Sequence, residues 1–392
     1  MTDVVITGAV RTAIGTFGGS LAAIPPAELA AQCVAEALKR LGTAPEAVGH
    51  VVIGNVIPTE PRDAYIARVA AMEGGIPQAV PALTVNRLCG SGLQAIVSAA
   101  QAIMLGDAEV AVAGGAESMS RSPHLLETGR FGQRMGDATL IDYMVGVLND
   151  PFGNGHMGVT AENVAERYGI SRAMQDAFAA ESQARAAHAI REGRFREQIL
   201  AVAVQRKRET VGFDTDEHPK ATSAEDLAKL RPAFSKTGSV TAGNASGLND
   251  GAAIVVLASA AAAERDGSRP LARIVGYAHA GVDPSEMGMG PVPAVERLLA
   301  RTGLRAADFD VIESNEAFAA QACAVSRALD LDPAKVNANG GAIALGHPLG
   351  ATGAIVTVKA LYELARVNGR YGLVTMCIGG GQGIAMAIER LH

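Results

Sequence analysis

The stretch 84–96, TVNRLCGSGLQAI, gives the first indication of both fold and chemistry. A short β-prone run ends at Cys89, and the small residues after it allow a sharp turn into an apolar helix. Ser91 is the expected N-cap of that helix. A thiol at the positive end of a helix dipole favours the thiolate, so a lowered pKa is expected for Cys89. The alternative is an inert core cysteine, because cysteine is among the most buried residue types.

Length and composition favour a compact α/β enzyme. A chain of 392 residues is long for one core, so two or three domains are expected. The chain is 48% hydrophobic, with 45 glycines and no tryptophan, and its net charge of −6 argues against a nucleic-acid-binding protein. No uninterrupted apolar run reaches the roughly 18 residues of a membrane span, and the first residues read as a strand and not as a signal peptide.

The cysteines predict a reduced, cytoplasmic protein without a metal site. Cys33, Cys89, Cys323 and Cys377 lie far apart and form no CxxC pair. Neither a zinc site nor a disulfide framework is therefore indicated, and a cytoplasmic location is the default.

Strands and helices alternate at both ends of the chain, which predicts βαβ units and a parallel sheet. In the first part the expected strands are 4–10, 51–54 and 109–113, and the expected helices are 26–41, 62–73 and 91–105. In the last part the expected strands are 272–279, 311–313, 373–377 and 383–388, and the expected helices are 292–301, 317–329 and 351–366. The rhythm breaks between residue 118 and about residue 244, where helices are expected over 161–168 and 172–192. This middle segment is interpreted as an insertion that caps a site or mediates assembly.

The two ends also match each other, with an offset of about 260 residues. HVVIGNV (50–56) falls on DVIESNE (310–316), and AVAGGAES (111–118) falls near VTMCIGGG (374–381). The Cys89 turn then falls on the loop that carries His347. A duplicated α/β unit would place these two side chains at equivalent strand-to-helix turns that face one crevice.

Four further segments carry side chains suited to catalysis or binding: His347 in NANGGAIALGHPLGATGA, Cys377 in VTMCIGGGQGIA, Asn315 in ESNEAFA and Ser246 in GNASGLNDGA. The glycines after Cys377 could present backbone N–H groups to an oxyanion. Each segment also has a structural interpretation, such as a satisfied histidine, a glycine hairpin or a helix cap. A dinucleotide site at GGGQG is rejected, because these glycines lead into a strand and do not open a helix.

Together the five segments resemble the thiolase family, and within it the short-chain acetyl-CoA acetyltransferases, or β-ketothiolases. The resemblance covers essentially the whole chain and includes RTAIGTFGGSL (11–21), MGVTAENVA (157–165) and MGMGPVPA (287–294). GNVIPTEPRD (54–63) and AAQACAV (319–325) are most similar to the broader-specificity bacterial β-ketothiolases.

The resemblance implies an α/β thiolase fold. Duplicated βαβαβαββ halves would form a layered α/β/α/β/α sandwich with an inserted loop domain. The expected N-terminal half is 1–118 plus about 245–270, and the expected C-terminal half is 271–392. The loop domain, 119–244, would bind coenzyme A and form the contacts of a homotetramer.

The resemblance also implies a reversible Claisen condensation of short acyl-CoA substrates, without a prosthetic group or a metal. Cys89 would take an acyl group as a thioester, His347 would activate Cys89, and Cys377 would move the α-proton of the second acetyl-CoA. Asn315 would hold a water that forms one oxyanion hole with His347. The N–H groups of Cys89 and Gly379 would form the other oxyanion hole.

The expected coenzyme A contacts border the acyl and pantetheine channel: His156, Met157, Ser246, Met287 and Phe318. Two positions depart from the family pattern. Ser314 replaces the more common alanine. The segment 219–223 lacks the usual arginine near the adenine, and Lys220 is expected to substitute for it.

Two other readings stay open: a degradative thiolase for longer chains, and a non-catalytic acyl-CoA-binding relative that should have lost one of the three reactive side chains. A decarboxylating ketoacyl synthase of similar fold would need a Cys-His-His set, which this chain lacks.

Overall fold

A mixed sheet of eleven strands runs through the structure, a computed structural model that describes residues 2–392. Its strands are β1 (Val4–Thr12), β2 (Gly15–Thr16), β3 (His50–Gly54), β4 (Ala82–Val85), β5 (Val110–Ser118), β10 (Ile199–Leu200), β13 (Asn249–Ser259), β14 (Ala272–Gly281), β15 (Val311–Ser314), β16 (Tyr371–Ile378) and β17 (Gln382–Arg390). The main order is β15-β16-β17-β14-β1-β13-β5-β3-β4.

The sheet consists of two equivalent halves. Read outward from the centre, the N-terminal half has the order β1, β13, β5, β3, and the C-terminal half has the matching order β14, β17, β16, β15. The halves join where Val5 pairs with Arg273 and Ile6 with Ala272. The N-terminal half ends at β4, and an isolated bridge between Ile312 and Val336 stands at the equivalent place in the other half. This arrangement is the internal repeat that the sequence predicted.

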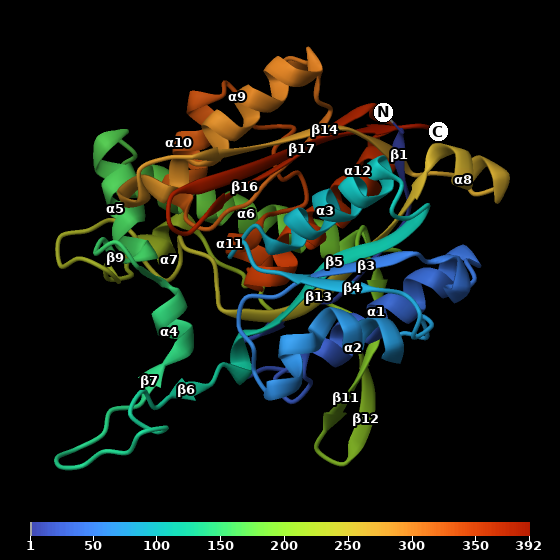
Figure 1. Ribbon diagram of the computed structural model, residues 1–392. Helices are drawn as coiled ribbons and strands as arrows, with labels where there is room; N and C mark the ends of the chain where they lie inside the picture. Colours follow the sequence, from blue (N-terminus) through green and yellow to red (C-terminus); the bar gives the residue numbers. More distant parts are fainter. Residues whose placement is uncertain (1) are drawn as a thin grey trace.

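Helices form the remaining layers. Their bounds are α1 (Pro26–Leu41), α2 (Ile66–Glu73), α3 (Ser91–Leu105), α9 (Pro291–Thr302), α10 (Ala319–Ala328) and α12 (Leu349–Val367), with the short α8 (Ala260–Arg265) and α11 (Ala342–Leu345). Figure 1 shows α3 and α12 between the two half-sheets, with α1 and α2 outside the N-terminal half and α9 and α10 outside the other. The predicted α/β/α/β/α layering is therefore confirmed.

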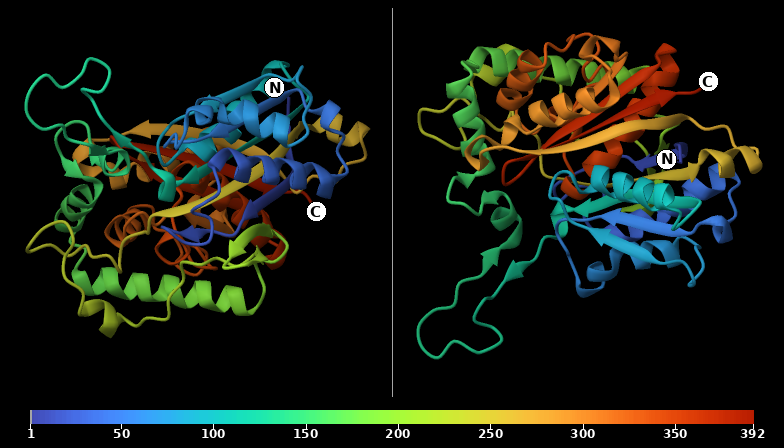
Figure 2. Two further views of the ribbon diagram at one scale, coloured as in Figure 1. Left: turned by 90° about the horizontal axis from the view of Figure 1, so that it is seen from below. Right: turned by 45° about the horizontal axis from the view of Figure 1, so that its top comes forward.

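The insertion between β5 and β13 lies along one side of this core and extends beyond it (Figure 2). It contains β6 (His124–Leu125), β7 (Ile141–Asp142), α4 (Tyr143–Val147), β8 (Asn149–Asp150), β9 (Gly155–His156), α5 (Met157–Arg167), α6 (Arg172–Arg191), β11 (Val202–Arg206), β12 (Glu209–Phe213) and α7 (Ala224–Ala228). The β6–β7 arm reaches away from the body, and β11 and β12 form a separate hairpin.

The expectation of a parallel sheet is only partly correct. β3 is parallel to β4 and β5, and β15 is parallel to β16, but β13 is antiparallel to both β1 and β5. The sequence pattern predicted no strand between residues 244 and 272, where β13 lies. All eleven residues of β13 are buried, so no polar alternation marks this strand in the sequence.

One expected helix has different bounds, and one short helix was not expected. The helix predicted over 62–73 begins as a 3-10 turn, Pro61–Tyr65, and becomes α-helical only at α2. The glycine-rich loop before α12 contains the one-turn helix α11, which was not predicted.

Helix α3 and the three residues before it together have the length and composition of a membrane span. The window Leu88–Leu105 has a mean hydropathy of 1.5 over 18 residues, and 56% of it is buried. In the fold this helix packs against α12 between the half-sheets, which explains its apolar composition as that of a core helix.

Close packing of β5 on α12 depends on Gly115. A Cβ atom at this position would lie 2.0 Å from the carbonyl oxygen of Gly350. We expect Gly115→Ala to lower the free energy of unfolding by about 1–3 kcal/mol or more, because the backbones would have to separate. Gly146→Ala in α4 is the matched control, since a Cβ there meets nothing within 4 Å. Equal stability of the two variants in urea denaturation would contradict this assignment.

Candidate functional site

A cavity of about 380 Å³ receives side chains from both halves and from the insertion. The N-terminal half contributes Cys89, and the C-terminal half contributes His347, Cys377 and Gly379. The predicted coenzyme A contacts His156, Met157, Ser246, Met287 and Phe318 also line this cavity. Residues predicted from separate sequence segments are thus brought to one place.

Cys89 stands on a tight turn just before α3. The preceding Leu88 has a φ of +46°, which is uncommon for a residue other than glycine and costs about 1–3 kcal/mol. Local hydrogen bonds hold this turn. Asn86 accepts from the Leu88 N–H at 2.9 Å, and the Ser91 hydroxyl donates to the Leu88 carbonyl at 2.7 Å. Gly90, and not Ser91, is the N-cap, so the hydroxyl of Ser91 braces the turn and does not cap the helix.

The expected low pKa of Cys89 is wrong. Burial raises the pKa of this thiol to about 11, although the N–H groups of Gly379 and of Cys89 itself act in the opposite direction. Desolvation of the thiolate therefore outweighs the helix dipole. These two N–H groups, which are the ones expected to form an oxyanion hole at Cys89, approach its sulfur from two different segments.

His347 is held at its main chain and at its ring. Its N–H donates to the side-chain oxygen of Asn249 at 2.9 Å, and its Nδ1 lies 2.7 Å from the hydroxyl oxygen of Thr352. Gly346, just before it, has a φ of +107°, and a Cβ there would lie 2.4 Å from Cγ of Asn249. Burial lowers the pKa of His347 to about 4, so the imidazole is neutral near pH 7.

Asn315 lies beside the histidine ring. Its side-chain nitrogen is 3.5 Å from Nε2 of His347, while its Oδ1 is buried without a hydrogen-bond partner in the described part of the chain. A buried amide oxygen of this kind can bind a water. Ser314, the departure noted before Asn315, does not displace it, because the Asn337 side chain bonds both the N–H and the carbonyl of Ser314.

Cys377 is 1% exposed at the end of β16, and its pKa is raised well above the ordinary thiol value by burial and by the neighbouring Cys89. The turn from β16 to β17 requires glycine, because Gly380 and Gly381 have φ values of +78° and +80°. This turn places Gly379 against Leu88 and Met157 at the cavity.

Glu117 lies beneath the site and was not predicted from the sequence. Its carboxylate accepts from the N–H groups of Val56, Ile57 and Gly350 and from the side chain of Asn55. Burial raises the pKa of Glu117 to about 8, against the effect of those N–H donors. Glu117 thus ties the start of α12, just after His347, to the N-terminal half.

Aromatic and thioether side chains form the outer wall of the cavity. The His156 ring stacks on Phe234, with ring centroids 4.7 Å apart, and Phe234 meets Phe318 edge to face at 6.2 Å. Phe234 was missed because nothing in its local sequence marks it. Its place depends on Gly158, where a Cβ would lie 2.3 Å from the Phe234 ring.

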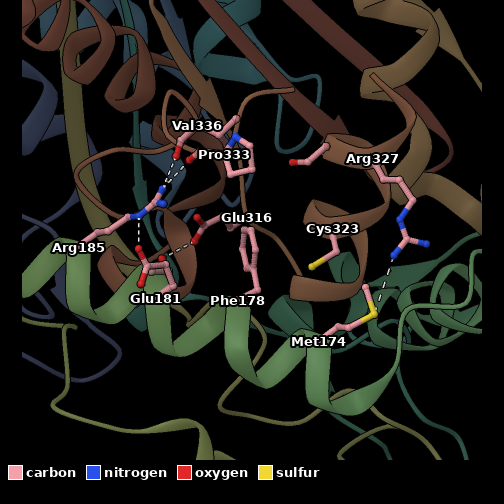
Figure 3. Close-up of a pocket in the computed structure, with 11 residues that line it drawn as sticks. Met174, Phe178, Glu181, Arg185, Glu316, Cys323, Arg327, Pro333 and Val336 are labelled. Carbon is pink, nitrogen blue, oxygen red and sulfur yellow. Dashed lines mark hydrogen bonds and ion pairs between the residues drawn. The ribbon is translucent and has the colours of Figure 1, made fainter. Parts of the chain in front are cut away.

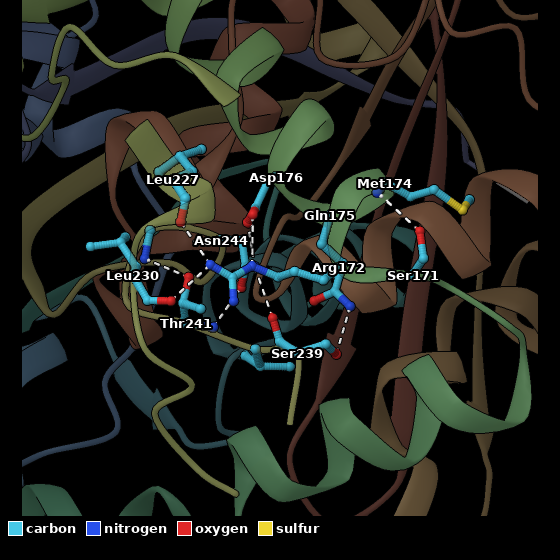
Figure 4. Close-up of polar contacts among 12 residues, drawn as sticks. Ser171, Arg172, Met174, Gln175, Asp176, Leu227, Leu230, Ser239, Thr241 and Asn244 are labelled. Atoms are coloured by element: carbon cyan, nitrogen blue, oxygen red, sulfur yellow. Dashed lines mark hydrogen bonds and ion pairs between the residues drawn. The ribbon is translucent and has the colours of Figure 1, made fainter. Parts of the chain in front are cut away.

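The loop with Ser246 is anchored to the insertion by a buried polar network (Figure 4). Asn244 donates to Asp176 at 2.9 Å and accepts from the Thr241 N–H at 2.7 Å. Arg172 in turn pairs with Asp176 at 2.6 Å and donates to two carbonyls at the end of α7. The network explains how a small-residue loop keeps Ser246 in a fixed position at the cavity.

Lys220 does not join the cavity. Its side chain is exposed, and its backbone N–H donates to Gln183 at 2.9 Å. His218, two residues earlier, packs instead against Gly247 in the Ser246 loop. An adenine contact from Lys220 therefore stays a prediction.

A second cavity, of about 340 Å³, lies between α6 and α10 (Figure 3). It shares no lining residue with the first, and its walls include Phe178, Arg185, Glu316 and Cys323. Glu316 is already bonded to Ser182 and Asn337. None of the predicted site residues lines this space. Within residues 2–392, no group of three or more His, Cys, Asp or Glu side chains could hold a metal ion.

The buried imidazole makes stability depend on pH. The pKa of His347 is about 4 in the folded chain against an ordinary 6.5, so between these values the unfolded chain binds more protons. The contribution of His347 to the free energy of unfolding is therefore fully present above pH 6.5 and is lost as the pH drops toward 4. The loss is on the order of a few kcal/mol for this group. Urea denaturation across this range should show a steeper loss for the unmodified protein than for His347→Gln. Parallel curves would contradict the assignment.

Comparisons with known proteins agree with this geometry. Residues 4–261 match the family model "Thiolase, N-terminal domain", and residues 268–390 match "Thiolase, C-terminal domain". The chain is 63% identical to the beta-ketothiolase BktB of Cupriavidus necator over 99% of each chain.

Solved structures show the same fold. The chain superposes on the crystal structure of the Bacillus anthracis acetyl-CoA acetyltransferase with a TM-score of 0.98 and 49% identity, over 100% of this chain and 99% of the other. Human mitochondrial 3-ketoacyl-CoA thiolase in complex with CoA gives a TM-score of 0.97 and 45% identity, over 100% of this chain and 98% of the other. This protein therefore belongs to the thiolase family.

Proposed function

We propose that this protein is an acyl-CoA:acetyl-CoA C-acyltransferase that acts on short acyl groups. One observation carries the proposal: Cys89, His347, Cys377 and Gly379 line the same cavity, and the Asn315 amide lies beside the histidine. The relatives named beta-ketothiolase and acetyl-CoA acetyltransferase support the same reaction class.

In the first half of the proposed reaction, an acyl group moves from coenzyme A to the enzyme. Nε2 of His347 takes the thiol proton of Cys89, and the sulfur attacks the thioester carbonyl of an acyl-CoA. The N–H groups of Cys89 and Gly379 stabilise the oxyanion, and coenzyme A leaves with the proton from His347. The product is an acyl-Cys89 thioester.

In the second half, a carbon–carbon bond forms. Cys377 first gives its thiol proton to His347, which is neutral again once coenzyme A has left. The Cys377 thiolate then takes an α-proton from acetyl-CoA, and a water on Asn315 together with the protonated His347 stabilises the enolate oxygen. The enolate carbon attacks the acyl-Cys89 carbonyl. The bond to sulfur breaks, which releases 3-ketoacyl-CoA and returns Cys89 as a thiolate. This thiolate takes the proton held by His347, while Cys377 keeps the α-proton, so all three groups regain their starting state. Thiolysis is the same sequence in reverse.

Binding of coenzyme A is proposed at the mouth of the cavity. The stacked pair of His156 and Phe234, with Met157, Met287 and Phe318, would enclose the pantetheine arm and the acyl group. The structure of a human thiolase in complex with CoA, at 45% identity, supports this type of ligand. Ser246 offers a hydroxyl at the same wall, and the free Lys220 side chain is proposed for the nucleotide end.

We also propose a cytoplasmic homotetramer in which the insertion, 119–244, makes contacts between subunits. On the β6–β7 arm, Phe131 is 91% exposed and Met135 is 90% exposed, which is unusual for large apolar side chains. Strand β4 is an open sheet edge with a partner on one side only, and such an edge can pair with a second chain. The four free cysteines suit a reducing compartment.

The experiment that tests this function is a comparison of thiolysis rates with acetoacetyl-CoA, 3-ketovaleryl-CoA and a long-chain 3-ketoacyl-CoA. A preference for the two short substrates is the expected result. A preference for the long substrate would instead assign a degradative thiolase. Binding of acyl-CoA without turnover of any substrate would overturn the enzymatic proposal.

A further inference from the structure

The hydroxyl of Thr352 lies between a histidine ring nitrogen and a carbonyl oxygen deep in the protein. Thr352 is 2% exposed in the first turn of α12. Its Oγ1 is 2.7 Å from Nδ1 of His347 and 2.8 Å from the carbonyl oxygen of Pro348. Both separations are those of good hydrogen bonds.

These two contacts need two protons, and the hydroxyl supplies only one. The Pro348 carbonyl can only accept, so the contact at 2.8 Å must contain the Thr352 proton; two oxygen atoms at this distance without a proton between them would repel. The contact at 2.7 Å then needs a proton from the other partner, which is Nδ1 of His347. Back-bonding from a threonine hydroxyl to a carbonyl four residues earlier is common in helices.

The side chain of Asn315 indicates the same protonation state of His347, with no proton on Nε2. Its side-chain nitrogen, which carries two protons, is the atom facing Nε2 of His347 at 3.5 Å. A donor faces an unprotonated ring nitrogen more favourably than a second N–H. With this amide orientation, Oδ1 of Asn315 is the buried oxygen without a hydrogen-bond partner among the described residues, as a water ligand requires.

We propose that Thr352 is a positioning residue that fixes His347 as the Nδ1–H tautomer, so that the lone pair of Nε2 is available for the Cys89 proton. The bond from Nδ1–H to Thr352 is kept when Nε2 gains its proton, so the imidazolium forms without any rearrangement of its neighbours. The proposal rests on the proposed function, because it concerns the base of that reaction.

A direct test does not depend on turnover. Neutron diffraction from crystals exchanged into D2O should show deuterium on Nδ1 of His347 and none on Nε2. Deuterium on Nε2 alone would overturn the proposal whether or not the protein is an active thiolase. Lack of turnover by the unmodified protein would instead count against the proposed function.

The kinetic test compares Thr352→Val, which keeps the shape and removes the hydroxyl, with Thr352→Ser, which keeps the hydroxyl. We expect Thr352→Val to lower kcat on the order of 10-fold to 100-fold with little change in KM, and Thr352→Ser to retain most activity. The acid limb of the pH profile should move to lower pH in the valine variant, because the imidazolium loses its acceptor. Wild-type kcat in Thr352→Val, or equal losses in both variants, would overturn the proposal.

Thr357 provides a matched control in the same helix. Its hydroxyl is also buried and donates to the carbonyl of Gly353, four residues earlier, at 2.8 Å. Thr357→Val should therefore remove the same kind of helix bond without a change in kcat or in the pH profile. If Thr357→Val reproduces the kinetic effect of Thr352→Val, the role of Thr352 is only structural and the proposal fails.

Discussion

Cys89→Ala is expected to abolish thiolysis and condensation, with a loss on the order of 10⁴-fold or more. The other thiol that lines the cavity, Cys377, is not expected to accept the acyl group in its place, because it is almost fully buried and has a still higher pKa. The variant should fold normally, since alanine fits the space of the thiol. Steady-state rates with acetoacetyl-CoA measure the loss, and mass spectrometry after incubation with acetyl-CoA should find no acetylated protein.

Cys323→Ala is the control for this result. Cys323 is also a partly buried free thiol with a pKa raised by burial, to about 11, but it lies in the second cavity. Its loss should leave both the rate and the acetylation unchanged. An acetylated Cys89→Ala protein that turns over substrate would show that another group is the nucleophile.

Much of the fold was predictable because apolar periodicity and turn residues mark it in the sequence. Helices α1 and α3 begin and end at the residues expected, since a proline or glycine stands at their ends. The internal repeat was visible because equivalent strands carry similar apolar runs. Strand β13 was missed, since a strand buried on both faces has no alternation to detect.

The candidate site was predictable as a set of residues but not as an electrostatic environment. Motifs identify Cys89, His347 and Cys377, which the fold brings to one cavity. The pKa direction of Cys89 was wrong, because the helix dipole can be inferred from the sequence whereas desolvation depends on tertiary packing. Thr352 and Glu117 were missed for the same reason: only the fold brings their side chains to the groups that they hold.

The raised pKa of Cys89 and the lowered pKa of His347 mean that both groups are neutral near pH 7. In the proposed reaction, the thiolate would therefore form as the sulfur attacks the substrate carbonyl, and the two N–H groups at the sulfur would stabilise the charge that develops there. The second half of the proposed reaction needs a separate group for the α-proton, since His347 gives the proton of Cys89 to the departing coenzyme A.

Cys377→Ala should separate these two halves. We expect condensation and thiolysis to fall by about 10²–10⁴-fold, the usual contribution of a positioned acid or base. Transfer of an acetyl group from acetyl-CoA to Cys89 should persist, because that step uses Cys89, His347 and the N–H of Gly379 and needs no α-proton. Mass spectrometry of the acetylated protein and steady-state rates on the same sample measure both effects.

Cys33→Ala is the matched control for Cys377→Ala. Both cysteines are almost fully buried, and burial raises the pKa of each far above the ordinary thiol value. Cys33, however, lies on α1 beside the carbonyl of Ala252, within the core of the N-terminal half. Its substitution therefore removes the same buried volume without removing a proton carrier from the cavity. Loss of acetylation in Cys377→Ala, or equal rates in the two variants, would contradict the role of Cys377 as the acid and base of carbon–carbon bond formation.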